Sequence, residues 1–324
     1  MWSLLLCVLS SAPVFAGGAV PPAAVTVDAV TLEPGARPSM LLAEARRRAR
    51  RGDHVGMRIV AEQALEQPGD HQRQAQLLIG VSYELEGQPA TALAMYDLLL
   101  SAYPANEQPE VLHLRRATVL GQLGEYRSAR RQLRKLERRQ GRAGLDPDRK
   151  LQSLILQGTW DLEEGRDRRG LKTLRDALAM PTASPWWRAK GHSVLIGYAL
   201  EQCDHFPLTG DPDEIESALD LRGQLLDLAY DQAVRLARLD QPRLTMEALT
   251  RLARSHAVVG DDVLELASYL DEAERLRRVE HVWLKAVGFF DRGLLVAQRD
   301  LGDAEAVRAL EAERTAIQER IERL

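Results

Sequence analysis

Glycine recurs in this sequence at the interval of a helix-turn-helix unit. Gly52, Gly87, Gly124 and Gly165 are 35, 37 and 41 residues apart. In each repeat a small residue lies seven positions before the glycine, and a small or apolar residue lies five positions after it. Small residues let two helices approach closely, and glycine permits the turn between them. The pattern therefore predicts helix pairs that stack along the chain, one pair per repeat.

The clearest repeat runs from Arg73 to Pro104. Its pattern positions are Ile79, Gly80, Tyr83, Gly87, Ala92, Tyr96 and Leu100. This repeat resembles the tetratricopeptide repeat family, and residues 110–141 match well through Ala117, Leu120, Gly124, Tyr126 and Ala129. The first and fourth repeats match more loosely, because Arg48 and Asp161 stand where the family prefers an aromatic residue.

The expected fold is all-α, an α-solenoid of about seven tetratricopeptide-like helix pairs with an irregular insertion in the fifth. Composition agrees, since aromatic residues make up only 5% and long runs rich in β-branched residues are absent. Residues 40–182 are expected to hold tetratricopeptide-like repeats. Residues 183–324 are expected to hold divergent helical repeats, with turns at Gly260 and Gly302.

The last predicted helix begins near Asp303 and carries one apolar stripe. The stripe consists of Val307, Leu310, Ile317 and Ile321. It suits a polar C-terminal capping helix whose outer face is hydrated. The alternative is a helix that pairs with a coiled-coil partner.

The N-terminus has the pattern of a signal peptide. An apolar run from Leu4 to Leu9 is followed by Val14-Phe15-Ala16, which predicts a signal peptide over residues 1–16 with cleavage after Ala16. No Lys or Arg precedes the apolar run, which departs from the usual pattern. Residues 17–39 are rich in Gly, Ala and Pro and predict a flexible tether. We expect a periplasmic or secreted protein, with no transmembrane span after cleavage.

Signals for an enzyme are weak. The histidines follow no metal-binding spacing, and Cys203 would be the only cysteine left after cleavage, more consistent with a small core residue than with a nucleophile. We therefore expect no catalytic residues, no metal and no cofactor. Motifs that read DNA or stack on bases are missing, so no nucleic-acid partner is expected.

The resemblance implies a concave groove lined by the first helix of each pair. Carrying the family's ligand-facing positions onto this sequence selects eleven residues: Arg46, Gln74, Leu77, Val81, Glu84, Leu114, Arg115, Thr118, Gln122, Ile155 and Thr159. The Lys/Asn/Arg set with which some members bind a C-terminal carboxylate is absent. The apolar members of the set would either contact a peptide or pack between helices, and both interpretations stay open here.

A second candidate surface is basic. Eight cationic residues follow helical spacing on one face: Arg127, Arg130, Arg131, Arg134, Lys135, Arg138, Arg139 and Arg142. They contribute to a net charge of +5 over residues 40–150, whereas residues 151–324 carry −8. Such a face could bind an anionic partner, or it could simply be the hydrated back of a helix.

Together these features predict an exported scaffold that binds a peptide or protein partner in the groove of its helical repeats. The partner's identity does not follow from the sequence. The alternative is binding of an anionic envelope polymer or a membrane surface through the basic helix face over residues 127–142.

Overall fold

The computed structural model describes residues 37–102, 109–140, 145–180, 185–206, 208, 210–266 and 269–324. The predicted signal peptide and nearly all of the predicted tether lie outside these residues, as does Pro104. The chain divides into two compact units between Asp146 and Pro147. Each unit is described by itself.

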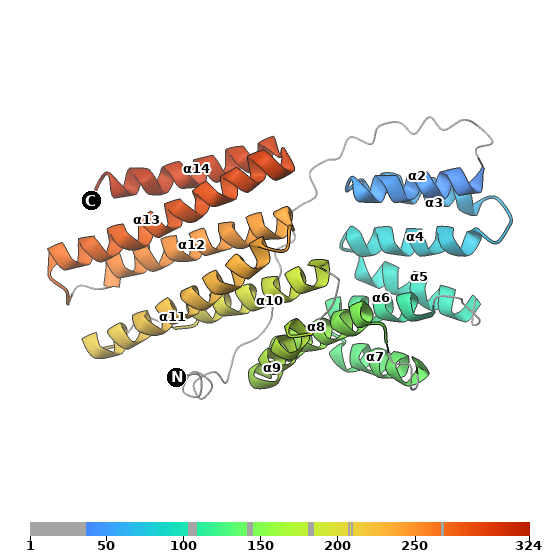
Figure 1. Cartoon of the computed structure of the whole chain (residues 1–324), viewed down its shortest axis with the longest axis horizontal. Helices are drawn as coiled ribbons and strands as arrows, with labels where there is room; N and C mark the ends of the chain where they lie inside the picture. The colour runs from blue at the N-terminus through green and yellow to red at the C-terminus, as the bar shows by residue number, and fades with distance from the viewer. Residues whose placement is uncertain are drawn as a thin grey trace. The chain divides into compact units, whose positions relative to one another are not determined.

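The first unit, over residues 37–146, contains three helix pairs. They are α2 (Pro38–Arg50) with α3 (His54–Leu65), α4 (Gln72–Leu85) with α5 (Pro89–Ala102), and α6 (Pro109–Gln122) with α7 (Tyr126–Gln140). Consecutive helices pack against one another throughout the unit, and the first helices α2, α4 and α6 follow in succession (Figure 1).

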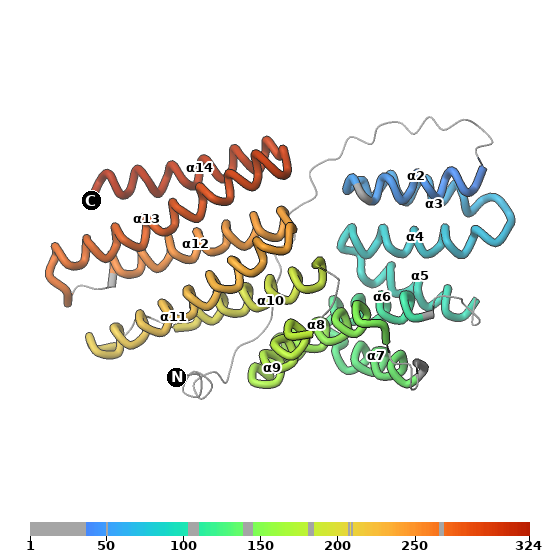
Figure 2. The backbone as a smooth tube through the Cα atoms, in the orientation of Figure 1, coloured from blue at the N-terminus to red at the C-terminus, as the bar shows by residue number. Residues whose placement is uncertain are grey.

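The second unit, from Pro147 onward, contains three more pairs and a last helix. They are α8 (Pro147–Glu163) with α9 (Asp167–Leu178), α10 (Pro185–Asp204) with α11 (Pro212–Ala237), α12 (Pro242–Leu266) with α13 (Glu272–Val296), and then a short π-helical turn η2 (Ala297–Leu301) and α14 (Ala304–Ile321). Figure 2 traces the chain back and forth through α12, α13 and α14. Every regular element in the described ranges is helical, which confirms the predicted fold class.

The four predicted turn glycines end their helices in the same way. Gly52, Gly87, Gly124 and Gly165 adopt φ values of +81°, +72°, +76° and +70°. In each case the N–H of the next residue donates to the carbonyl five positions back, at 3.1, 2.8, 2.8 and 2.7 Å. Each glycine also donates to the carbonyl three positions back. This pair of bonds is the Schellman motif, whose left-handed position favours glycine because a Cβ would be strained there.

Small residues within the helices allow the two helices of a pair to approach each other closely, as the repeat pattern predicted. A Cβ added to Gly80 on α4 would lie 2.7 Å from the ring of Tyr96 on α5. Gly158 on α8 and Gly170 on α9 face one another, because a Cβ on Gly170 would lie 2.9 Å from the carbonyl oxygen of Gly158. Both helix pairs therefore pack at distances that alanine would disturb.

One predicted turn is wrong. Gly260 lies within α12, which continues to Leu266. A Cβ on Gly260 would lie 2.4 Å from Trp283 of α13, so this glycine makes room for an indole ring instead of a turn. Gly302 does adopt a left-handed conformation, with φ of +61°, and ends the π-helical turn before α14.

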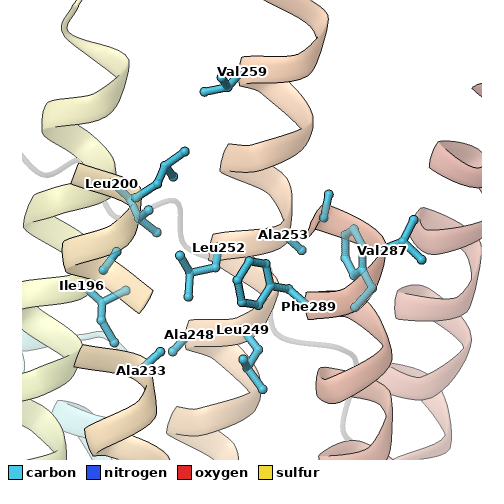
Figure 3. Close-up of a cluster of buried hydrophobic side chains, with 14 of the residues drawn as sticks. Ile196, Leu200, Ala233, Ala248, Leu249, Leu252, Ala253, Val259, Val287 and Phe289 are labelled. Carbon is cyan, nitrogen blue, oxygen red and sulfur yellow. The ribbon is translucent and has the colours of Figure 1, made fainter. Parts of the chain in front are cut away.

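The two units have separate apolar cores. In the first, α2, α3 and α4 enclose one cluster, and Tyr96 and Leu99 of α5 pack with Leu112 and Val119 of α6 in another. In the second, a large cluster draws side chains from the helices α10 to α14, and Figure 3 shows part of it around Leu252. Burying one such aliphatic side chain stabilises the fold by about 1.5–3 kcal/mol.

The apolar stripe of α14 packs within its own chain. Leu310 and Ile317 are 4% and 6% exposed, and Val307 and Ile321 pack against the same core cluster. The helix is also tied to α12 by an ion pair between Arg254 and Glu313 at 2.7 Å. The stripe is therefore occupied without a coiled-coil partner.

The predicted insertion is the segment between α10 and α11. Nε of Arg222 on α11 donates to the carbonyl of Phe206 at 2.9 Å, and the same guanidinium pairs with Asp262 of α12. Among the residues described, none of the helices is long and apolar enough to cross a membrane.

Candidate functional site

Part of the predicted binding surface comes together on the first helices of the first unit. Arg46 on α2 and Gln74 on α4 are exposed, and Nη2 of Arg46 donates to Oε1 of Gln74 at 3.0 Å. Leu77 lies about one turn further along α4 and is half-buried. The accessible members of the predicted set are here called the first-helix surface: Arg46, Gln74, Leu77, Glu84, Arg115, Thr118 and Gln122.

Glu84 joins three helices in this surface. Its Oε2 accepts a hydrogen bond from the hydroxyl of Tyr96 on α5 at 2.6 Å and from Nη1 of Arg115 on α6 at 3.1 Å. Burial raises the pKa of Tyr96, and the charge of Glu84 acts in the same direction. Burial opposes the charge of Arg115, but Glu84 and Tyr96 outweigh it and raise the pKa of Arg115. Glu84 and Arg115 thus form a charged pair that fixes the surface.

Three apolar residues of the predicted set are buried. Val81, Leu114 and Ile155 are 8%, 3% and 2% exposed, and Val81 and Ile155 belong to core clusters. The structure therefore favours the second interpretation for these residues, packing between helices, because no ligand reaches side chains so enclosed.

The two threonines of the set bond to their own helices. Oγ1 of Thr118 donates to the carbonyl of Leu114 at 3.0 Å, and Oγ1 of Thr159 donates to the carbonyl of Ile155 at 2.9 Å. Ile155 and Thr159 lie on α8 in the second unit, so they are considered apart from the first-helix surface.

The basic helix is α7. Five of the eight predicted cations are exposed on it and are here called the basic face: Arg127, Arg131, Arg134, Lys135 and Arg138. The opposite side is apolar, with Ala129, Leu133 and Leu136 at most 1% exposed. Within the described part of the chain, no acidic side chain forms an ion pair with any of the five. The face is an unneutralised cationic strip.

The other three predicted cations do not extend this strip in the described structure. Arg130 is 8% exposed and lies on the buried side, where it replaces an apolar residue. Nothing is described of the side chain of Arg139, and Arg142 lies outside the described residues.

Cys203 and His205, two positions apart in the sequence, do not form a nucleophilic site. Cys203 is 1% exposed in the large core cluster, and burial raises the pKa of its thiol to about 12. The nucleophilic thiolate is therefore strongly disfavoured near neutral pH. Nδ1 of His205, just after the end of α10, lies 2.6 Å from the carbonyl oxygen of Glu201 in the last turn of that helix. The described ranges contain no group of three His, Cys, Asp or Glu residues that could hold a metal ion.

Sequence reasoning missed a pocket in the second unit. It has a volume of about 620 Å³ and is lined by α9, α10 and α11. Arg188 and His192 are one turn apart on α10. Arg235 lies in the last turn of α11, and Arg238 is the C-cap residue of that helix. These arginines are visible in the sequence, but residues 151–324 carry a net negative charge, so the sequence did not indicate a cationic site there. The three helices that bring the arginines together meet only in the folded chain.

Comparison with known proteins assigns this chain to no family. No family model matches the chain, and no curated protein matches its sequence. Among solved structures, the chain is similar to a tetratricopeptide repeat protein from Parabacteroides merdae ATCC 43184. The two share 15% identity, with 85% of this chain and 98% of that one covered and a TM-score of 0.40.

The tetratricopeptide-like pattern is carried by the chain's own helix pairs. Four Schellman turns recur at the repeat interval, and Gly80 packs against Tyr96 at the positions where the pattern places a small residue and an aromatic one. The chain is a helical-repeat protein.

Proposed function

We propose that this protein is a protein-interaction scaffold whose first-helix surface binds a peptide segment of its partner. The observation that carries the proposal is the prearranged set of side chains on α2, α4 and α6. Arg46 is held by Gln74, which lies about one turn from the half-buried Leu77 on α4, and Arg115 is held by Glu84. Because these side chains are already ordered, binding loses little conformational entropy.

The chemistry of the surface selects a type of peptide. Arg46 keeps donors beyond the one used by Gln74 and suits a carboxylate, since a guanidinium has five N–H groups. Leu77 offers an apolar contact about one helical turn from Gln74. A peptide with an acidic residue and an apolar residue close together would use both.

Peptide display followed by titration tests this function. Peptides selected on the purified protein should enrich for an acidic residue near an apolar one. Their affinity should fall about tenfold or more for Leu77→Asp and for Arg46→Glu, since buried interface contacts typically cost 1–3 kcal/mol. Leu98→Asp is the matched control, because Leu98 is a half-exposed leucine on the second helix α5. Equal losses for Leu77→Asp and Leu98→Asp would contradict the proposal.

The basic face supports a second candidate function, the binding of an anionic polymer or membrane surface. Five exposed cations without an ion-pair partner in the described structure favour it. Such binding should weaken steeply with salt, because the Debye length falls from about 10 Å at 0.1 M to about 3 Å at 1 M. It should also be lost when four of the exposed arginines become Gln: Arg127, Arg131, Arg134 and Arg138. Arg130 is left unchanged because it is buried.

Export is part of the proposal. The apolar run from Leu4 to Leu9 and the small residue Ala16 support a signal peptide over residues 1–16. The tether expected to reach residue 39 is shorter at its end, because α2 already begins at Pro38. N-terminal sequencing of the protein recovered from a cell-envelope fraction tests it. A mature chain that begins at Gly17 is expected, and an intact Met1 would contradict cleavage.

A further inference from the structure

The pocket of the second unit lies where α10 packs against both α9 and α11. All three helices contribute side chains to its lining. Its volume of about 620 Å³ falls within the range of 300–1,000 Å³ usual for small-molecule sites. All three helices belong to the same compact unit. The pocket is therefore a separate feature from the first-helix surface.

Positive charge gathers around this pocket. Four arginines line it: Arg175, Arg188, Arg235 and Arg238. Among the described residues of the lining, Asp231 is the only carboxylate. The second unit as a whole is acidic, so this concentration of arginine is local. Guanidinium groups favour carboxylate and phosphate because their N–H groups match the spacing of two oxygens.

Several of these arginines have no acidic partner. Within the described residues, no ion pair joins Arg188, Arg235 or Arg238 to a carboxylate. Nε of Arg188 is moreover buried and has no hydrogen-bond acceptor. A buried N–H of a charged group that has no acceptor lowers the stability of the fold. An anion in the pocket would provide the missing hydrogen-bond acceptor.

Two lining residues, His192 of α10 and Gln232 of α11, form a buried polar pair without charge. Nδ1 of His192 lies 2.9 Å from Oε1 of Gln232, and both residues are less than a tenth exposed. Because the amide oxygen only accepts, His192 carries its proton on Nδ1. Burial lowers the pKa of His192, Gln232 opposes that effect, and Arg235 and Arg188 lower it further. The imidazole is therefore neutral near pH 7, and the charge of the pocket comes from its arginines.

Much of the remaining lining is aliphatic. Leu171 and Leu178 come from α9, Leu195 from α10 and Leu228 from α11, and each is half-buried. Apolar surface of this kind is stabilised when an aliphatic chain covers it. The pocket thus combines a cationic part with an apolar part.

A neighbouring pocket shows that the combination is specific. A pocket of about 490 Å³ is built in the same way, with α12 between α11 and α13 and with the buried His256 in its lining. Its charges are mixed, however, with Asp227 opposing Lys285 and Arg292. In addition, Arg292 lies over the ring of Phe289, 5.7 Å from its centroid. This second pocket therefore carries a smaller excess of positive charge than the first.

We propose that the pocket between α9, α10 and α11 binds a small amphiphilic anion, with a carboxylate or phosphate head on Arg188 and Arg235 and an aliphatic body against the leucines. A fatty acid and an alkyl phosphate share this chemistry. The site goes beyond the proposed scaffold function, because it lies in the other unit and takes a small ligand.

Isothermal titration of the purified protein with four probes tests the site. Octanoate and octyl phosphate carry both a head and a tail, 1-octanol lacks the charge, and acetate lacks the tail. At least one of the two amphiphilic anions should bind saturably at one site, about tenfold or more tighter than 1-octanol and acetate. Which of the two binds tells a carboxylate site from a phosphate site. Equal binding of 1-octanol, or no saturable binding of either anion, would overturn the proposal.

Three variants locate the site. The double variant Arg188→Gln with Arg235→Gln should weaken binding about tenfold or more and leave the melting temperature nearly unchanged, since neither residue holds an ion pair. Arg292→Gln in the neighbouring pocket and Arg299→Gln on an exposed surface are matched charge controls, expected to bind as wild type. Addition of octanoate should also shift the ring signals of His192 in NMR spectra. Wild-type affinity of the double variant, or a loss in Arg292→Gln instead, would show that the anion does not bind in this pocket.

Discussion

Asp161 and Arg166 meet across the end of α8 through both main chain and side chains. The N–H of Arg166 donates to the carbonyl of Asp161 at 2.7 Å, and Nη1 of Arg166 lies 3.5 Å from Oδ1 of Asp161. Arg48 and Asp53 form the same pair at the end of α2 with the charges exchanged, at 2.7 Å. These positions of a Schellman motif usually share an apolar contact. In the two repeats that depart from the aromatic pattern, an ion pair takes its place.

Replacing Asp161 tests this contact. Asp161 is 1% exposed, and Nε of Arg169 also lies 3.0 Å from its Oδ2. Asp161→Asn should lower the free energy of unfolding by about 1–3 kcal/mol, because charge-assisted hydrogen bonds are lost while the half-exposed arginines remain solvated. Urea denaturation measures the change. Asp176→Asn, at an exposed pair with Lys172, is the control and should change stability by less than about 0.5 kcal/mol. Similar effects of the two variants would show that burial of Asp161 is unimportant.

Gly80 should not tolerate a methyl group. A Cβ there would lie 2.7 Å from the ring of Tyr96 and 3.3 Å from Cβ of Met95. Gly80→Ala should therefore destabilise the fold by about 1–3 kcal/mol through overpacking, although alanine favours helices. Gly223 on α11 is the matched control, since no atom lies within 4 Å of an added Cβ. Gly223→Ala should stabilise by about 0.5–1 kcal/mol. The melting temperatures of the two variants should move in opposite directions, and a shared direction would refute the close contact.

Glu84 should stabilise the first unit by linking its helices. Glu84→Gln removes the charge that Arg115 faces at 3.1 Å and weakens the acceptor for Tyr96 at 2.6 Å. We expect a loss of about 1–3 kcal/mol. A double-mutant cycle with Arg115→Met isolates the pair, and its coupling energy should exceed about 0.5 kcal/mol. A coupling near zero would mean that the two side chains are independent.

Stability should fall as the pH drops below the ordinary histidine range. In the folded protein, burial lowers the pKa of both His192 and His256 below the ordinary histidine value of 6.5. The unfolded chain then takes up protons near pH 6.5 while the folded chain does not, so the free energy of unfolding is highest above pH 6.5 and declines below it. The decline is at most about 1.4 kcal/mol per pH unit for each histidine.

Urea denaturation at pH 7.5, 6.5 and 5.5 measures this decline, and His256→Gln should make it shallower. The series stops at pH 5.5 because burial raises the pKa of Glu201 and Asp204, and protonation of those carboxyls would favour the folded state. An equally steep decline in the variant would remove His256 as a cause.

The basic face should affect binding without affecting folding. Its cations have no ion-pair partner in the described structure, so Arg131→Gln and Arg134→Gln together should change the free energy of unfolding by less than about 0.5 kcal/mol. Arg130→Gln should cost more, since Arg130 is 8% exposed. Thermal melts followed by circular dichroism compare the stability of the double variant with that of Arg130→Gln. A large loss in the double variant would show that the strip is part of the fold.

The sequence alone determined the helix pairs and four of their turns. Glycine is the residue that accepts a left-handed backbone at little cost, so Gly52, Gly87, Gly124 and Gly165 marked local events that needed no knowledge of the rest of the chain. The small residues beside them indicated close packing for the same local reason, as Gly80 shows. The breaks around α11 were equally readable from Gly and Pro.

Tertiary structure decided what each of these residues faces. Gly260 looks like a turn residue in the sequence, yet Trp283, 23 positions later, makes it a packing residue within α12. Leu114 and Leu77 occupy related positions on their helices, but only Leu114 is fully enclosed. The pocket around Arg188 and Arg235 requires three helices to converge. Local preferences arise within a few residues along the chain, whereas burial and charge grouping depend on distant segments that only packing brings together.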